Sequence, residues 1–346
     1  MKLLKFPYVV KRHIIKQMNY HEVFWLSIVS HKAVQMIQQI PWRQIKTIQF
    51  RVYNTETSIR VIDSEQSRLM NIRYALRNFV GGDSRTLLVL GIKCTIKWNP
   101  FCDEFILCTD QSNIFEKLRN HIQSLFFTNH FHLDWRQERA YAEEFCQFLG
   151  NLRSSSAELH QKMETQQLEH YSDGSPTQEH VCIQNQLYGS FKESSKFYTI
   201  QDLHMKRAEM IAKDVLRCFK GKSAILENCC LYQFQIYEFL EKWKFNAAFK
   251  NLEFLLAIPI PGRSFNLDRQ WIYSHFQTKK LDPSKKLPVY HYEDKSTNQQ
   301  YEFSSPYYMV REHDGAVASI GVEDNRFVFA VWNLNEKQMA EKIATL

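Results

Sequence analysis

The residues best suited to chemistry are three histidines and an aspartate that lie close together in the sequence. They are His121, His130, His132 and Asp134. A His-x-His pair on a strand directs both rings to one face, and imidazole and carboxylate groups are common zinc ligands. No cysteine or glutamate at a suitable spacing completes a metal site, and surface or packing histidines are the alternative. We therefore expect no metal and no other cofactor.

A second pattern, Lys220-Gly221-Lys222-Ser223, ends like a phosphate-binding loop. That loop needs a glycine at position 216, where this chain has Leu216, so its backbone could not curl around a phosphate. The chain also has only ten glycines. No G-x-S-x-G, H-E-x-x-H or paired-carboxylate pattern stands out, and the sequence predicts no enzymatic activity.

The cysteines are irregularly spaced and sparse for a chain of this length, which is typical of reduced thiols. The pairs Cys102 with Cys108 and Cys229 with Cys230 remain candidates for redox partners. The eight cysteines are Cys94, Cys102, Cys108, Cys146, Cys182, Cys218, Cys229 and Cys230.

Composition narrows the class of protein. The 346 residues are 44% hydrophobic and 14% aromatic, which suits one large or two smaller packed domains. The net charge of +7 comes from dispersed basic residues, so a solvated basic surface is favoured over a nucleic-acid interface. Neither a signal peptide nor an apolar run of about 20 residues is present. We expect a soluble protein of the cytoplasm, the nucleus or both, without a membrane partner.

The first forty residues have the pattern of three short helices. Val10, Ile14 and Met18 recur every four residues, and Asn19 and Ser30 are suitable caps for the next two helices. Apolar residues lie on several faces of so short a segment, and the excess favours a partner protein. The alternative is that these helices are simply the first part of an ordinary core.

The middle of the chain mixes apolar alternation with helical periodicity. Strands are predicted at 45–53, 59–62, 87–92 and 104–108, and helices at 113–126, 138–152 and 200–219. The segment 64–79 is ambiguous, with a helix at 66–79 as one interpretation. The polar stretch 153–180 is predicted to be a long loop.

The C-terminal part has the clearest pattern. An apolar run at 226–231, an amphipathic helix at 236–243 and a strand at 251–258 predict parallel strand pairing, with the helix on one face. Three strands at 307–312, 316–322 and 327–332 follow as an antiparallel meander, turned first by Asp314-Gly315. The predicted fold is α/β, with a partly parallel sheet flanked by helices.

Residues 1–40 resemble the F-box of the large nematode F-box families. Phe6 stands where a generic F-box has leucine, Glu22-Val23 stands for Asp-Leu, and the third-helix tryptophan is replaced in the region of His31-Lys32-Ala33. The matching residues are Phe6-Pro7-Tyr8-Val9-Val10, Ile14-Ile15, Gln17-Met18, Glu22-Val23-Phe24, Leu26-Ser27 and Val29-Ser30.

Residues 226–332 resemble the F-box-associated domain, type 2, of the same proteins. The departures are Phe245-Asn246-Ala247-Ala248 in place of a Gly-rich joint, and Ser319 in place of threonine. The matching residues are Phe239-Leu240, Trp243, Leu252-Glu253-Phe254-Leu255, Arg311, Asp314-Gly315, Ala318-Ser319-Ile320 and Val331-Trp332.

The resemblance implies an F-box at 1–40 and a substrate-recognition domain at 41–346, with a leucine-rich-repeat-like arrangement as one form of its sheet. It implies a non-enzymatic subunit of an SCF-type (cullin-RING) ubiquitin ligase, which binds a Skp-type adaptor and an unknown protein substrate. A cullin-independent interaction module and a nucleic-acid-binding protein are the alternatives. The expected adaptor-binding residues are Phe6, Pro7, Val10, Ile14, Ile15, Met18, Val23 and Leu26.

Overall fold

The structure is a computed structural model, and its described residues form two compact units of α/β type. The N-terminal unit comprises the described residues of 1–140 and 151–156, and the C-terminal unit those of 157–346. The described residues are 5–52, 56–65, 67–75, 84–99, 104–111, 113–126, 130–135, 154–160, 162–174, 178–245, 248–282, 284–295, 297 and 299–345.

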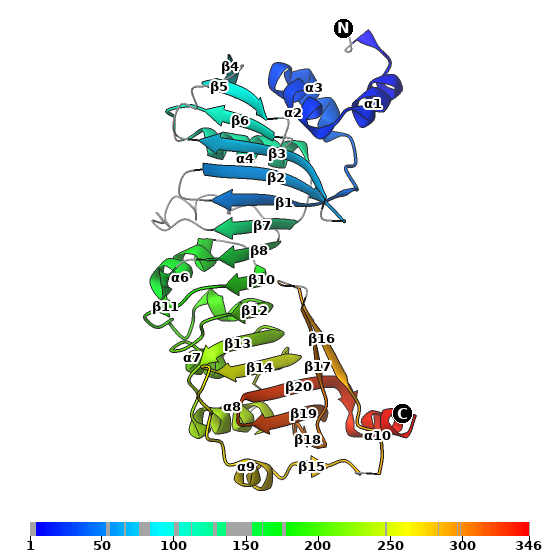
Figure 1. Ribbon diagram of the computed structural model, residues 1–346. Coiled ribbons are helices and arrows are strands. Elements are labelled where there is room, and N and C mark those ends of the chain that lie inside the picture. Colours follow the sequence, from blue (N-terminus) through cyan, green and yellow to red (C-terminus); the bar gives the residue numbers. More distant parts are fainter. Residues whose placement is uncertain are drawn as a thin grey trace. The chain divides into compact units, whose positions relative to one another are not determined.

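A mixed sheet forms the centre of the N-terminal unit (Figure 1). Its strand order is β4-β5-β6-β3-β2-β1-β7. The pairs β1–β7 and β3–β6 are parallel, and the other pairs are antiparallel. The strands are β1 (Ile45–Val52), β2 (Glu56–Asp63), β3 (Arg68–Ala75), β4 (Ser84–Val89), β5 (Ile92–Asn99), β6 (Glu104–Cys108) and β7 (His130–Trp135).

The helices of this unit pack against the sheet or against one another. Helix α4 joins β6 to β7, and its Phe115 ring meets Phe50 of β1 with centroids 6.2 Å apart. Asn19 and Glu22 form the predicted capping box of α2, and Ser30 caps α3 as predicted. The helices are α1 (Tyr8–Gln17), α2 (Tyr20–Val29), α3 (His31–Gln38) and α4 (Ile114–Leu125).

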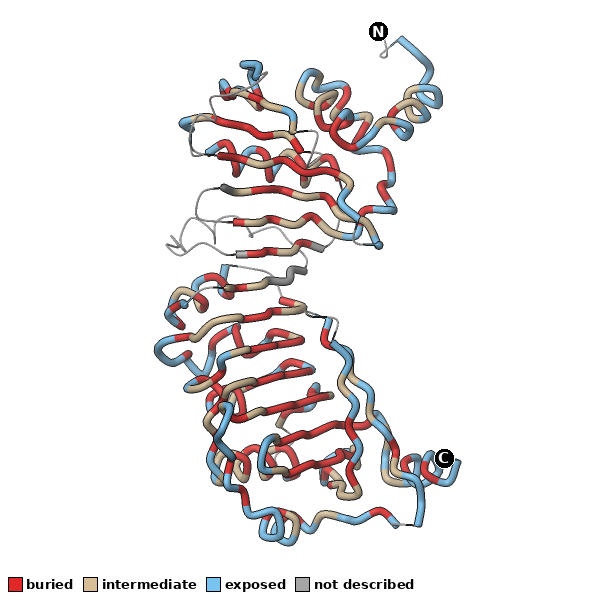
Figure 2. Tube along the Cα trace, viewed as in Figure 1, coloured by how far each residue is buried: buried red, intermediate tan, exposed pale blue. Residues whose placement is uncertain are grey.

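The C-terminal unit contains a run of parallel strands in the order β10-β12-β13-β14. Burial along these strands is nearly continuous, as expected when both faces of a parallel sheet are covered (Figure 2). These strands and their connections are β10 (Gln178–Ile183), η2 (Lys196–Thr199), β12 (Asp202–Met205), α7 (Ala212–Cys218), β13 (Ser223–Cys229), α8 (Gln233–Phe245) and β14 (Phe254–Pro259). Before them in the chain come β8 (Ser154–Leu159), whose first three residues are assigned to the N-terminal unit, β9 (Met163–Glu164) and α6 (Thr165–Gly174). Strand β9 pairs with β11 (Leu187–Tyr188).

An antiparallel meander continues this sheet in the order β14-β20-β19-β18-β15. The two faces of β20 are covered by different elements. Phe329 packs against Phe239 and Trp243 of α8, while Val328 and Ala330 join a core cluster under a separate hairpin, β16–β17. The elements are α9 (Arg269–His275), β15 (Lys279–Lys280), β16 (Tyr290–Asp294), β17 (Gln299–Phe303), β18 (Tyr307–Val310), β19 (Ala316–Glu323), β20 (Arg326–Asn335) and α10 (Glu336–Ala344).

The C-terminal predictions are confirmed: β13, α8 and β14 form a parallel strand–helix–strand unit, and β18–β20 form the meander. Three other predictions are wrong. The segment 66–79, for which a helix was one interpretation, contains strand β3, and the loop predicted at 153–180 contains β8, β9, α6 and the start of β10. The helix predicted at 200–219 is strand β12 followed by the short α7. The helix predicted at 138–152 lies outside the described residues.

Candidate functional site

The structure separates the predicted adaptor-binding residues into three groups. Ile15 and Val23 are fully buried, so a partner could reach them only if the helices opened. Ile14, Met18 and Leu26 are of intermediate exposure, and Phe6, Pro7 and Val10 are exposed.

Helix α2 is held by the rest of the N-terminal unit. The His21 ring lies edge-on to Trp98 and Phe105, with centroids 5.3 Å from each, and its Nε2 accepts a hydrogen bond from Asn71 N of β3 at 3.2 Å. The Ser27 hydroxyl of α2 contacts His121 of α4. Many of the apolar residues of 1–40 are therefore buried within this unit. This burial is expected if the three helices are the first part of an ordinary core.

Most of the large apolar side chains of 1–40 that stay exposed lie in or just before α1, and Val29 at the end of α2 is the other. Phe6 is 44% exposed, Val9 75% and Val10 40%. The same stretch, 5–17, contains four Lys or Arg residues and no Asp or Glu. Figure 2 shows α1 as mostly exposed. We call Phe6, Tyr8, Val9 and Val10 the α1 face. It combines apolar side chains with positive charge, which suits an acidic partner surface.

One of the histidines singled out in the sequence, His121, has a structural role. Ser27 donates its hydroxyl hydrogen to Phe24 O, so His121 Nε2, 2.7 Å from Ser27 Oγ, is the donor in their contact. Burial lowers the pKa of His121 to about 4 and keeps the ring neutral. Asp134 of β7 is paired with Arg51 of β1 at 2.8 Å. Among the residues that the structure describes, no candidate three-ligand metal group includes His121 or His132.

A charged cluster that the sequence did not reveal lies in the C-terminal unit. Buried His204 of β12 sits between two carboxylates, with Nδ1 2.6 Å from Asp294 Oδ2 and Nε2 2.8 Å from Glu227 Oε1. Both ring nitrogens therefore donate, which requires the imidazolium form. Burial works against that charge, but the bonds to Asp294 and Glu227 outweigh it, and the pKa of His204 is raised. Lys206 Nζ donates to the same Glu227 oxygen at 2.7 Å.

Next to this cluster, Ser223 of β13 donates to Asp202 at 2.7 Å, and its Oγ lies 2.6 Å from the Tyr292 hydroxyl of β16. Nucleophilic catalysis by serine needs a neutral base that accepts the hydroxyl proton. His204 already holds protons on both nitrogens, and Ser223 contacts a carboxylate instead. These polar contacts are better explained as a structural link that holds the β16–β17 hairpin on the sheet, because Tyr292 and Asp294 both come from β16.

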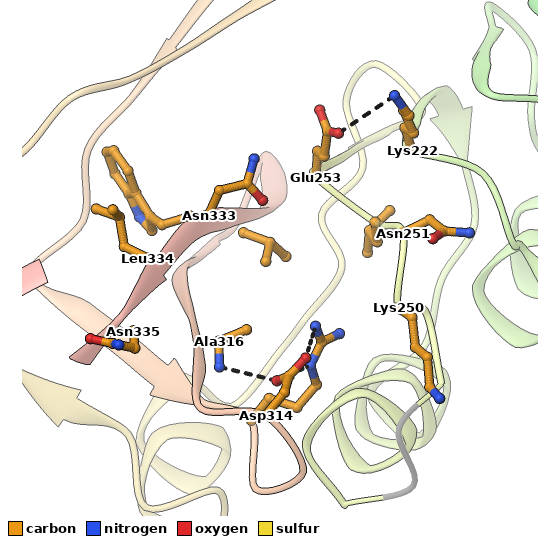
Figure 3. Close-up of a pocket in the computed structure, with 13 residues that line it drawn as sticks. Lys222, Lys250, Asn251, Glu253, Asp314, Ala316, Asn333, Leu334 and Asn335 are labelled. Atoms are coloured by element: carbon orange, nitrogen blue, oxygen red, sulfur yellow. Dashed lines mark hydrogen bonds and ion pairs between the residues drawn. The ribbon is translucent and has the colours of Figure 1, made fainter. Parts of the chain in front are cut away.

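A cavity of about 430 Å³ lies where β14 and β20 meet (Figure 3). Its walls include several residues that carried the C-terminal resemblance, namely Leu252, Glu253, Arg311, Asp314, Val331 and Trp332. Figure 3 shows Lys222 and Glu253 on one side and Asp314 below Ala316 on the other. Lys222 Nζ and Glu253 Oε1 are 3.9 Å apart and both partly exposed, so this ion pair is weak.

The strongest contacts at this cavity hold the meander together. Arg311 is buried and donates through Nε and Nη2 to the two Asp314 oxygens, each at 2.8 Å. Its guanidinium lies 5.1 Å from the Trp243 ring of α8. Asp314 also accepts from Ala316 N, and Gly315 adopts φ +73°, as the turn requires. The Arg–Asp-Gly motif is therefore explained by a turn fixed to α8.

The cysteine prediction is confirmed for the described cysteines, which are all free: Cys94, Cys108, Cys182, Cys218, Cys229 and Cys230. Among the described helices, none has the length and apolar character needed to cross a membrane. Comparison of the chain with protein-family models, curated proteins and solved structures found no match.

Proposed function

We propose that this chain is the substrate-recognition subunit of an SCF-type ubiquitin ligase, with residues 1–40 as its F-box and 41–346 as its F-box-associated domain. It would hold a protein target near the ubiquitin-charged enzyme and raise the effective concentration of target lysines, without forming or breaking a covalent bond itself. We propose that the protein acts in the cytoplasm, the nucleus or both.

The observation that carries the proposal is the exposed α1 face. Phe6 and Val10 belong to the residues that matched the F-box pattern, and they remain accessible while α2 and α3 supply the buried support. The successive parallel strands β10, β12, β13 and β14, joined by connections that include short helices, also support the leucine-rich-repeat-like form of the second domain.

The structure changes which variants test adaptor binding. Because α2 packs on β3 and contacts α4, deleting residues 1–40 would expose the core of the N-terminal unit. Point variants of the full chain avoid this problem. We choose Phe6→Asp and Val10→Asp at exposed positions, in preference to the half-buried Ile14 and Leu26.

Purified full-length chain should capture a Skp-type adaptor in a pull-down, and each α1 variant should weaken capture about tenfold or more. Loss of one apolar anchor is worth roughly 1.5–3 kcal/mol, and a charge in its place adds to that loss. Leu88→Asp on β4, which is 69% exposed, is the matched control and should leave capture unchanged.

Unchanged capture by both α1 variants would reject this interface. Recovery of a cullin with the adaptor, measured by mass spectrometry of the purified complex, supports the ligase role. Recovery of the adaptor without a cullin would instead favour the cullin-independent interaction module.

A further inference from the structure

A second cavity, of about 420 Å³, lies at the carboxyl ends of two parallel strands. Cys229 ends β13 and Pro259 ends β14, and both line it. We call this cavity the carboxyl-end groove. Its lining residues are Cys229, Cys230, Leu231, Tyr232, Gln233, Phe234, Pro259, Arg263, Ser264, Phe265 and Asn266.

Large apolar side chains are exposed at this groove. Tyr232 is 66% exposed and Phe234 63%, and their rings stack with an interplanar angle of 9° and centroids 6.2 Å apart. Glu209 pairs with Cys229 through an isolated β-bridge, which brings its exposed neighbour Met210 to the same edge of the sheet. Aromatic and methionine side chains are enriched at protein interfaces, and grouped exposure of this kind marks interaction sites.

The charged side chain that lines the groove is positive. The lining contains one arginine and no Asp or Glu. Arg263 is exposed and forms no ion pair with any residue that the structure describes, whereas Arg269, the first residue of α9, is paired with Asp324 at 2.8 Å. Ser264 donates to Asn266 Oδ1 at 2.7 Å, which directs the Asn266 side chain and leaves its NH₂ group as a donor. An occupant should therefore be apolar at one point and anionic beside it.

We propose that the carboxyl-end groove binds a short peptide segment of a partner protein, with a large apolar side chain on Tyr232 and Phe234 and a neighbouring carboxylate on Arg263. This inference rests on the proposed function, because the peptide would be the recognition segment of the substrate. An acidic apolar segment matches both the exposed rings and the unpaired guanidinium, and an arginine suits a carboxylate because it can bind both oxygens.

The test selects random peptides displayed on phage against the purified full-length chain. The enriched peptides are then measured by fluorescence anisotropy. We expect them to share an Asp or Glu next to a large apolar residue. Phe234→Ala and Arg263→Glu should each weaken binding about tenfold or more. Replacing the acidic residue of the peptide by its amide should weaken binding to the native chain but not to Arg263→Glu.

Matched controls are Tyr188→Ala, an exposed aromatic residue outside the groove, and Lys250→Glu, an exposed cation outside it. Both should bind the peptides like the native chain. Failure to enrich any peptide, or binding that the groove variants do not change, overturns the proposal. A dimer of the chain that Phe234→Ala converts to monomers would show that a second copy occupies the groove, which also overturns it.

Adaptor capture separates this proposal from the function on which it rests. The groove variants should retain capture, and Phe6→Asp should lose capture yet keep peptide binding. A chain that binds peptides in the groove but no adaptor would refute the ligase role alone.

Discussion

At the scale of single residues, the most informative group is the buried imidazolium of His204. It joins β12 to Asp294 of the β16–β17 hairpin and to Glu227 of β13. A buried ion pair contributes little net stability compared with apolar packing, but the loss of one partner leaves an uncompensated charge. The cluster should therefore make the packing of the β16–β17 hairpin on the sheet depend on pH.

Replacement of His204 by glutamine should lower the free energy of unfolding by about 3–5 kcal/mol near pH 6, because it leaves Asp294 buried without its cation. The folded-state pKa of His204 is raised, so its contribution is complete below the unfolded-state pKa and is lost as pH rises through the folded-state value. Urea unfolding at a series of pH values should show the difference between native and variant chains shrinking toward alkaline pH.

Glu227 has a lowered pKa because its bonds to His204 and Lys206 outweigh the effect of burial. The contribution of Glu227 to the free energy of unfolding is therefore complete above its unfolded-state pKa and is lost as pH falls through the folded-state pKa. His291→Gln, on the exposed side of the same hairpin, is the control and should not alter unfolding. A pH-independent difference between native chain and His204→Gln would contradict this account.

Gly221, the glycine of the phosphate-loop-like pattern, has a structural role. A Cβ at this position would lie 1.8 Å from Ile200 O. The neighbouring N–H groups are already used, because Lys220 donates to Tyr198 O and both Lys222 and Ser223 donate to Gln201 O. The glycine permits the close approach of the two chain segments before β12 and β13.

Gly221→Ala should therefore destabilise the protein by about 3 kcal/mol, since its methyl group would meet backbone atoms. Gly262→Ala is the comparison. Its φ is +79° with nothing within 4 Å, so it should cost only the backbone strain of about 1–2 kcal/mol. Equal midpoints for the two variants in urea unfolding would show that the close approach has no energetic effect.

At the scale of elements, the helices and strands predicted best from the sequence are those with one buried apolar face and one exposed polar face. Helix α8 buries Ile236, Phe239, Leu240 and Trp243, as its periodicity predicted. Strand β3 was missed because its burial does not alternate. Met70, Asn71 and Ile72 are all buried, and the side-chain NH₂ group of Asn71 donates to Glu104 at 2.7 Å.

Helix α6 and strand β10 were missed because few of their residues are large and apolar. Helix α6 buries Leu168 and Tyr171 among polar residues, and β10 begins with the buried polar Gln178. The charged cluster was missed for a related reason. His204 belongs to a strand whose four residues are all buried, and an apolar period of two could not be detected.

The packing of α8 on β20 yields a prediction for this element. Trp243→Ala should lower the free energy of unfolding by about 3–5 kcal/mol, because the side chain is fully buried, lies 4.9 Å from Phe329 and supports the Arg311 guanidinium. Trp271→Ala on α9, a partly exposed tryptophan, should cost no more than about 1 kcal/mol. Denaturant unfolding followed by circular dichroism distinguishes them, and similar losses would refute the central role of α8.

At the scale of the whole molecule, the net charge of +7 bears on the nucleic-acid alternative. Many basic residues of the C-terminal unit are matched with acidic ones, as in Lys242–Glu238 and Lys279–Glu336. The basic stretch at α1 is interleaved with apolar side chains instead of aligned as a stripe. The charge therefore reflects a dispersed surface excess.

We expect binding of the full chain to a labelled DNA or RNA duplex to be weak at physiological salt. Fluorescence anisotropy across a salt series should show a shallow slope, since few phosphates would be neutralised at once. Tight binding with a steep salt dependence would revive the nucleic-acid alternative and count against the solvated-surface interpretation.

The adjacent cysteines at the carboxyl-end groove have a practical consequence for labelling. Burial raises the pKa of Cys229 to about 12, and its thiol lies 3.2 Å from Ile258 O, so it should resist alkylation at neutral pH. Cys230 lines the same groove and is partly exposed. With Cys102, Cys146 and Cys218 replaced by serine, a maleimide dye should attach at Cys230, where its emission would report directly on whatever enters the groove.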